Sequence, residues 1–265
     1  MTTPTTTTTA ERRAAAADGG VPFGRLLRTE LRKLTDTRAS RWLLIAIVAA
    51  TPVVVTVMLF VAAPKDLTYN NFVDYTQTPQ KILLPALAIL AMTSEWSQRT
   101  GLVTFTLVPD RRRVLLAKFT AVLALGLVAI AVAFAAAGIG NALGAGLRHG
   151  NGSWAFGPAG FGEITLVQVI GLVEGMAFGM ALLITASAII AYYVLPSIWS
   201  ALFTLTASLK TIAAWFDLNK ASGALYDQDI TGKGWLQLLV AVTIWIAVPL
   251  AFGVWRVGRT EVKSS

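Results

Sequence analysis

The chain contains 265 residues, of which 55% are hydrophobic and 14% are charged, and it carries a net charge of +8 at pH 7. Soluble domains average about 45–50% apolar and about 25% charged residues, so this composition, with a mean hydropathy of +0.64, indicates an integral membrane protein. The chain has no cysteine and a single histidine, which excludes disulfides, thiolate metal sites and cysteine nucleophiles. Its basic residues flank hydrophobic segments, which favours contact with lipid headgroups over binding of nucleic acid.

The region before the first hydrophobic segment divides into two parts. Residues 1–20 are rich in Thr and Ala and lack hydrophobic periodicity, so we expect a disordered tail. Residues 21–41 predict an amphipathic helix in the membrane interface, with Arg25, Arg28 and Arg32 on its basic face. Its apolar face consists of Phe23, Leu26, Leu27, Leu31 and Leu34.

Glu30 breaks this amphipathic pattern because helical geometry places it inside the apolar face. An ionised carboxylate there is costly without a partner. We expect Arg41, Lys118 or a residue of another subunit to pair with Glu30.

Residues 42–258 hold the segments that are expected to cross the bilayer. A span needs about 20 apolar residues, and Leu43–Ala63 supplies 21 uncharged ones. Ile164–Leu205 exceeds the length of one span, so we divide it near Thr185-Ala186-Ser187 into two helices. Lys118 lies one turn inside the third span, where its amine is expected to snorkel toward the surface. The remaining clear spans are Val114–Gly140 and Leu236–Trp255.

The segment Ile82–Ser94 is short for a span, and a re-entrant segment is the alternative. If it crosses from a start near Pro79, the chain has six spans and both termini lie in the cytoplasm, including a tail at 259–265. This arrangement places 16 basic residues inside and 6 outside, as the positive-inside rule requires. Five spans would leave one basic terminus outside. The sequence therefore predicts an all-α integral membrane protein with six transmembrane helices after an interfacial helix.

The fourth expected span carries a glycine stripe and one acid. Gly171, Gly175 and Gly179 share a face and would let another helix approach closely. Glu174 lies beside that face, and an acid within the membrane suggests a functional site. For a single unpaired acid, however, a protonated or hydrogen-bonded packing residue is the interpretation that we favour.

Sequence motifs for catalysis are missing. Gly232-Lys233 lacks the upstream glycine and the following hydroxyl of a P-loop, so the chain is not expected to bind ATP phosphates or to be an enzyme. Asp227 and Asp229 are two loop acids for which solvation is expected rather than metal binding. No metal site and no cofactor are predicted.

The most informative segment is Glu95–Lys118, which the charge pattern places in the cytoplasm. A plain basic anchor explains its arginines, but it does not require an acid followed five residues later by Thr, or a Pro before the arginines. Here the chain resembles the membrane subunits of type-2 ABC exporters. The matching residues are Glu95, Thr100, Pro109, Arg111 and Lys118, whereas Arg99 and Asp110 depart from the family pattern. The run Glu30–Leu34, with Arg32 and Lys33, also resembles the interfacial elbow helix of that family.

The resemblance implies a permease subunit that forms a dimer, expected to be a homodimer, and binds separate cytoplasmic ATP-binding subunits. ATP and Mg²⁺ would be bound by those partners, and the transported molecule would be small and amphipathic. Coupling to the partner is expected at Glu95, Arg99, Thr100, Pro109, Arg111 and Arg112. The alternatives are a secondary transporter driven by an ion gradient, which would require more ionisable groups within its spans, and a membrane scaffold without transport.

Overall fold

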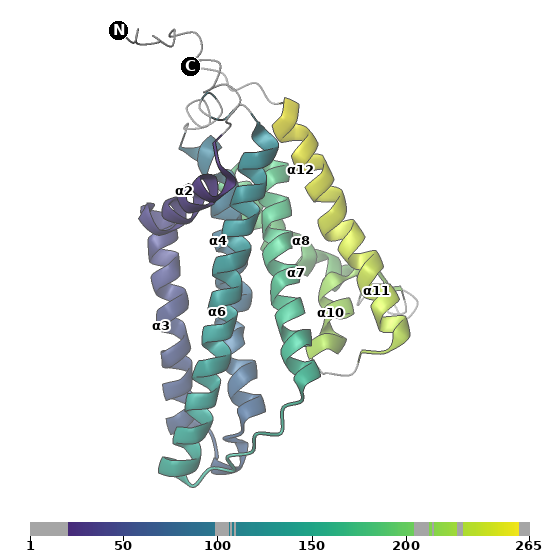
Figure 1. Ribbon diagram of the computed structural model, residues 1–265. Coiled ribbons are helices and arrows are strands. Elements are labelled where there is room, and N and C mark those ends of the chain that lie inside the picture. Colours follow the sequence, from purple (N-terminus) through teal and green to yellow (C-terminus); the bar gives the residue numbers. More distant parts are fainter. Residues whose placement is uncertain are drawn as a thin grey trace, which may run out of the picture.

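The computed structural model describes residues 21–98, 106, 108, 110–203, 212–213, 215–226 and 230–259. The expectations for the tails at 1–20 and 260–265 therefore lie outside the described residues. Within the described residues, every regular element is helical (Figure 1). The elements are α2 (Phe23–Asp36), α3 (Arg38–Val61), η1 (Pro64–Asp66), α4 (Tyr69–Ser97), α6 (Arg111–Arg148), α7 (Pro158–Leu182), α8 (Thr185–Leu202), α10 (Leu218–Tyr226), α11 (Gly232–Val242), the π-helical turn η2 (Thr243–Ala247) and α12 (Val248–Arg259).

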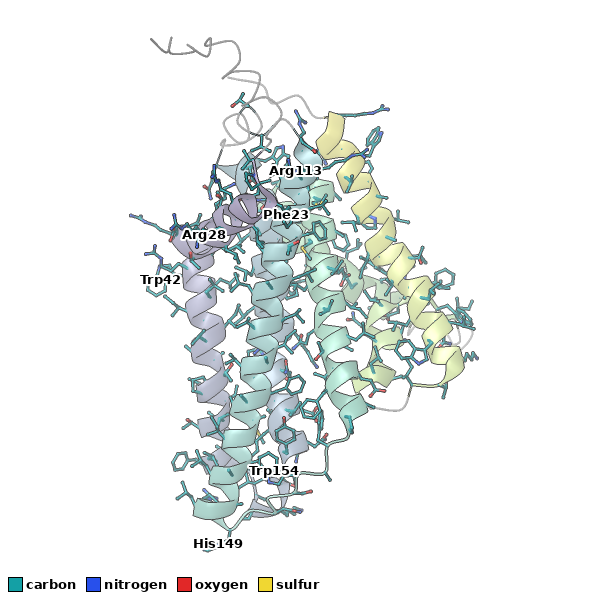
Figure 2. All side chains as sticks on the ribbon, in the orientation of Figure 1. Phe23, Arg28, Trp42, Arg113, His149 and Trp154 are labelled. Atoms are coloured by element: carbon teal, nitrogen blue, oxygen red, sulfur yellow. The ribbon has the colours of Figure 1, made fainter. Side chains whose placement is uncertain are left out.

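The long helices form a bundle, and α2 lies across one end of it (Figure 1). The end of α4, the start of α6 and the end of α12 lie at this same end, which we call the α2 end. The opposite end contains His149 and Trp154, labelled in Figure 2. Helices α3, α4, α6 and α7 run side by side between the two ends, and α12 leans against α7.

Helix α2 confirms the amphipathic pattern but is shorter than the predicted 21–41 segment. It ends at Asp36, because Thr37 adopts an extended backbone, and Arg38 already begins α3. Leu34 is buried on the inner face of α2, whereas Arg28 and Arg32 are exposed on its outer face. The chain therefore turns at Thr37 from the crosswise helix into the bundle.

Helix α4 corrects the expected start near Pro79. It begins at Tyr69, where the Thr68 hydroxyl accepts a hydrogen bond from the backbone of Asn71, and it runs for 29 residues. The polar side chains in its first half are accommodated because they form hydrogen bonds with α6. The amides of Gln77 and Gln80 donate to backbone carbonyls of α6 at 3.4 and 3.0 Å. Such pairing is what permits polar side chains inside a membrane bundle.

The expected division of 164–205 is confirmed. Helix α7 ends at Leu182, Leu183 takes a left-handed backbone with φ of 59°, and α8 begins at Thr185. Helix α6 extends beyond the predicted 114–140 segment at both ends, beginning at Arg111 and ending at Arg148.

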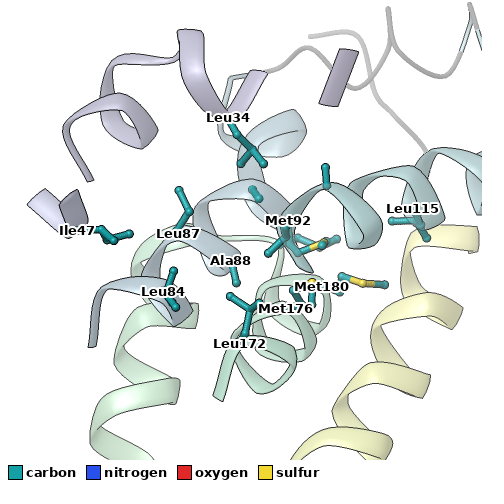
Figure 3. Close-up of a cluster of buried hydrophobic side chains, with 14 of the residues drawn as sticks. Leu34, Ile47, Leu84, Leu87, Ala88, Met92, Leu115, Leu172, Met176 and Met180 are labelled. Atoms are coloured by element: carbon teal, nitrogen blue, oxygen red, sulfur yellow. The ribbon is translucent and has the colours of Figure 1, made fainter. Parts of the chain in front are cut away.

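Three apolar clusters hold the described part of the bundle together, and two of them centre on α7. One joins α2, α4, α6 and α7 through Leu34, Met92, Leu115 and Met180 (Figure 3). The other packs α10 and the η2 turn onto α7, with Phe178 and Trp245 among its members. Helix α7 contributes to both clusters, so it is the central element of the fold.

The outer surface of the bundle is apolar. Side chains such as Val48, Val61 and Val128 are exposed on α3 and α6, which water would disfavour but lipid accepts. Among the described residues, five helices are long and apolar enough to cross a membrane: α3, α6, α7, α8 and the α11–α12 stretch. Helix α4 does not meet that criterion. The fold is that of a helical integral membrane protein.

Candidate functional site

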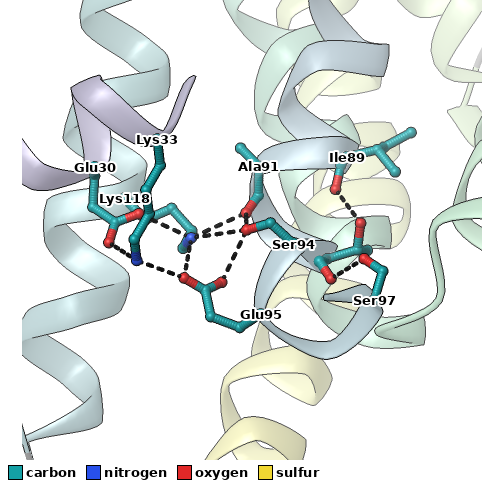
Figure 4. A network of polar contacts seen from close by, with 9 residues as sticks. Glu30, Lys33, Ile89, Ala91, Ser94, Glu95, Ser97 and Lys118 are labelled. Carbon is teal, nitrogen blue, oxygen red and sulfur yellow. Dashed lines mark hydrogen bonds and ion pairs between the residues drawn. The ribbon is translucent and has the colours of Figure 1, made fainter. Parts of the chain in front are cut away.

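Four charged residues from three helices meet beneath α2 (Figure 4). Glu30 and Lys33 project from α2, Glu95 lies near the end of α4, and Lys118 lies two turns into α6. We call these four residues the ion cluster. It lies at the α2 end of the bundle, between the crosswise helix and the ends of two long helices.

Lys118 is the centre of the ion cluster. Its side chain is only 4% exposed, and its ammonium lies 2.9 Å from Glu30 Oε2 and 2.8 Å from Glu95 Oε1. It also donates to the backbone carbonyl of Ala91 at 3.1 Å. An ammonium has three donors, and these three acceptors satisfy all of them. The expected snorkelling of Lys118 to the surface is therefore wrong, because its partners lie inside the protein.

Lys33 lies on the more exposed side of the ion cluster. Its ammonium lies 2.7 Å from Glu30 Oε1 and 3.0 Å from Glu95 Oε1. Burial lowers the pKa of Lys33, but the nearby carboxylates of Glu95 and Glu30 outweigh this effect, so its pKa is raised above the ordinary value. Lys33 therefore remains charged at neutral pH and contributes to both ion pairs.

Two acids and two bases give the cluster a formal charge of zero. This balance matters because Glu30, Glu95 and Lys118 are 5%, 2% and 3% exposed. Removing one member of a buried pair typically costs about 3–5 kcal/mol, because the remaining charge stays buried without compensation. The cluster therefore ties α2 to α4 and α6 as a unit.

A pocket of about 280 Å³ lies beside the ion cluster. The four charged residues line it together with Ser94 of α4, Thr37 of the α2–α3 turn and Ser40 of α3. Ser94 donates a hydrogen bond to Glu95 Oε2 at 3.1 Å, which satisfies the carboxylate oxygen that faces away from the lysines.

The structure describes three of the six expected coupling residues. Glu95 is buried within it, so a bond from Glu95 to another subunit is not available in this arrangement. Arg111 donates to the Val257 carbonyl of α12 at 2.6 Å, and Arg112 is exposed. Arg99, Thr100 and Pro109 lie outside the described residues, as do Asp227 and Asp229.

Further hydrogen bonds at the α2 end join helices that are distant in sequence. Arg113 donates to the Val21 carbonyl at 2.9 Å, which fixes the start of α2 to α6. Arg256 of α12 donates to the Ala181 carbonyl at the end of α7 at 2.6 Å. Together with Arg111 and the ion cluster, these bonds tie five helix ends into one layer.

The glycine stripe of α7 lies close to neighbouring backbone and side-chain atoms. A Cβ on Gly175 would lie 2.7 Å from the Pro85 carbonyl oxygen of α4, and one on Gly179 would lie 2.9 Å from Met92 Cβ. Gly171 faces the hydroxyl of Tyr192 on α8 at 3.1 Å. The helix that approaches this stripe is therefore α4 of the same chain. Glu174 is 6% exposed and lines a separate pocket.

Sequence reasoning named Lys118 as a partner for Glu30 but missed the bonds from Lys33 to Glu95. Those residues are 62 positions apart, and no local periodicity links them. It also treated Asp110 as a departure from a motif, whereas Asp110 caps α6 by accepting from the backbone amides of Arg112 and Arg113. An acid directly before a helix is a recognisable capping signal.

An apolar outer surface, with a charged cluster buried at one end of the bundle, is characteristic of a helical membrane protein. Comparison of the chain with protein-family models, with curated proteins and with solved structures gave no match.

Proposed function

We propose that this chain is the transmembrane permease subunit of an ABC exporter, located in the plasma or inner membrane. In this proposal the chain crosses six times, with α4 as the second span and α2 as the elbow helix. The α2 end faces the cytoplasm, and both termini lie there. Two copies form the pathway for a small amphipathic molecule, and separate subunits bind ATP and Mg²⁺.

The observation that carries the proposal is the ion cluster. Glu95 and Lys118 flank the segment between α4 and α6, and both bond to Glu30 of α2 or to its neighbour Lys33. A force applied to that segment would therefore reach α2, α4 and α6 together. Energy from a cytoplasmic partner needs such a mechanical link to reach the spans.

The electrostatics of the α2 end support the same assignment. Arg28 and Arg113 lie at this end (Figure 2), and α12 places Arg259 there as well. Basic residues concentrate on the cytoplasmic side of membrane proteins. They also suit contact with anionic lipid headgroups.

The proposal predicts a partner that binds nucleotide. Arg112 is exposed beside the segment that would contact it. We expect that the protein, isolated in mild detergent from its native cells, retains a stoichiometric subunit that is labelled by azido-ATP. The variant Arg112→Glu should reduce the retained subunit about tenfold, because a reversed charge repels the surface that attracted the arginine.

The matched control is Lys65→Glu, an equivalent charge reversal at an exposed position in η1, at the opposite end of the bundle. It should leave the labelled subunit unchanged. If the wild-type protein retains no nucleotide-binding subunit, the exporter assignment is wrong. If both reversals act equally, the α2 end is not the docking surface.

A further inference from the structure

A second pocket, of about 240 Å³, is partly open to the surface and is separate from the ion cluster. Helices α4, α7, α8 and α10 form its walls. Its polar lining consists of Lys81, Gln168, Glu174, Tyr192, Asn219 and Ser222. A water molecule occupies about 30 Å³ in the liquid, so the pocket has room for a small organic molecule.

Glu174 is the distinctive feature of this pocket. Its side chain is buried, and its Oε1 atom has no hydrogen-bond partner among the described residues. The described residues place no basic nitrogen within 4 Å of this carboxylate. A buried acid oxygen without a hydrogen-bond partner is costly within a membrane bundle, so this atom is available to bind a ligand.

The other polar groups in the pocket have interactions of their own. Gln168 donates to the side-chain oxygen of Gln77 at 2.8 Å and to its backbone carbonyl at 3.0 Å. Lys81 interacts electrostatically with Asp74 on its own helix, which offsets its positive charge. Glu174 is therefore the acid in this pocket for which the described residues provide no counterion.

The walls are held in place before any ligand binds. Asp217 caps α10 by accepting from the backbone amides of Asn219 and Lys220, and it accepts a hydrogen bond from Ser200 of α8. Gly171 has no side chain, and a Cβ there would lie 3.1 Å from the Tyr192 hydroxyl. This glycine keeps α7 from intruding on the pocket. A preformed cavity lowers the entropic cost of binding.

We propose that this pocket binds the ammonium head of a small amphipathic amine, with Glu174 as its counterion. The apolar walls at Val167, Ile170 and Leu218 would contact the hydrocarbon part of the ligand. The Asn219 amide and the Ser222 hydroxyl also line the pocket. Their oxygen atoms would accept hydrogen bonds from the remaining N–H groups of the ammonium. The identification of the amine as an exported substrate rests on the proposed function. The binding of an amine in this pocket does not.

The test is equilibrium binding of radiolabelled hexylammonium to the full-length protein in mild detergent. Unlabelled 1-hexanol has the same carbon chain and no charge, so it should not displace the amine from the wild-type protein. Glu174→Gln keeps the size of the side chain and removes its charge. It should weaken hexylammonium binding about tenfold or more, the value of one charge-assisted hydrogen bond.

Glu163→Gln is the matched control, because Glu163 is an acid of the same helix that does not line the pocket. It should bind hexylammonium like the wild type. Equal binding by Glu174→Gln, displacement by hexanol at equal concentration, or no saturable binding would each overturn the proposal. If Glu174→Gln does not fold, the comparison of amine with alcohol on the wild-type protein decides alone.

These outcomes are distinct from the test of the ATP-binding partner. Hexylammonium binding is measured on the permease without nucleotide or partner. A failure here leaves the Arg112 experiment unaffected. Loss of the partner in that experiment likewise leaves this pocket unaffected.

Discussion

Lys118 shows how a single residue can be misjudged from its position in the chain. A lysine near the start of a hydrophobic helix is expected to reach for water. In this protein two carboxylates and one backbone carbonyl surround its ammonium, and the side chain is 4% exposed. The carboxylates come from helices that sequence alone does not bring together, which is why the buried position was not predicted.

Replacing Lys118 with Met tests the energetic importance of the ion cluster. Glu30 and Glu95 would then share Lys33 alone, leaving one negative charge too many in a buried site. We expect Lys118→Met to destabilise the folded protein by about 3–5 kcal/mol. The measurement is thermal unfolding in detergent, followed by the near-ultraviolet signal of the tryptophans.

The control for this substitution is Lys220→Met, on the exposed surface of α10. It removes the same charge where water screens it, so its effect should be small. Equal loss of stability in both variants would show that the cluster contributes no more than a surface lysine.

At this scale the sequence was informative about Glu30 and less so about Glu95. The helical projection of α2 shows directly that Glu30 needs a partner, and Lys118 was one of three candidates. Glu95 was expected to contact another subunit, since it belongs to a motif. Whether it couples to a partner stays a prediction, and in this structure any such effect would pass through Lys33 and Lys118.

At the scale of the element, α7 depends on its glycines for contact with α4. The Pro85 backbone lies so close to Gly175 that a Cβ would be 2.7 Å from the carbonyl oxygen and 3.1 Å from the Cα. Backbone atoms cannot turn aside as a flexible side chain can. Close approach of backbones is how helices associate where lipid removes the hydrophobic driving force.

Gly175→Leu should therefore separate α7 from α4 and lower the thermal stability of the protein, with an expected loss of about 1–3 kcal/mol or more from overpacking. Gly162→Leu is the matched control on the same helix, since a Cβ there meets nothing within 4 Å. Thermal unfolding of both variants, followed as for Lys118, measures the difference. The close packing of α7 on α4 would be energetically unimportant if the two variants unfolded at the same temperature.

How well each helix could be predicted from the sequence depends on where its polar groups find their hydrogen-bond partners. The break between α7 and α8 was predictable, because 42 residues exceed one span and Thr185-Ala186-Ser187 interrupts the apolar run. The first half of α4 was not, because Gln77 and Gln80 make it look like a loop. Their partners are carbonyls of α6, 53 and 49 residues away, respectively. A polar helix inside a bundle can be recognised only once its neighbours are known.

The whole molecule has two distinct ends. Trp42 and Trp154 lie near opposite ends (Figure 2) and are 70% and 60% exposed, as expected for side chains at the two membrane surfaces. The ends differ in charge, since the arginines of α2, of the start of α6 and of the end of α12 gather at one of them, whereas Arg148 lies at the other. This asymmetry favours one orientation, with the α2 end in the cytoplasm.

Cysteine labelling tests this orientation together with the number of spans. The native chain has no cysteine, so each introduced thiol is the sole target of an impermeant maleimide. Gln98 and Asn151 are both exposed, one at the end of α4 and the other after α6. With six spans, Asn151→Cys should react in intact cells and Gln98→Cys should react only after the membrane is opened. If α4 did not cross, the two sites would exchange sides, because every later loop would be inverted.

Thr29→Cys, exposed on α2, is the reference for the cytoplasmic face and should follow Gln98→Cys. Labelling of Gln98→Cys from outside, with Asn151→Cys protected, would exclude the six-span topology and the cytoplasmic position of the segment between α4 and α6.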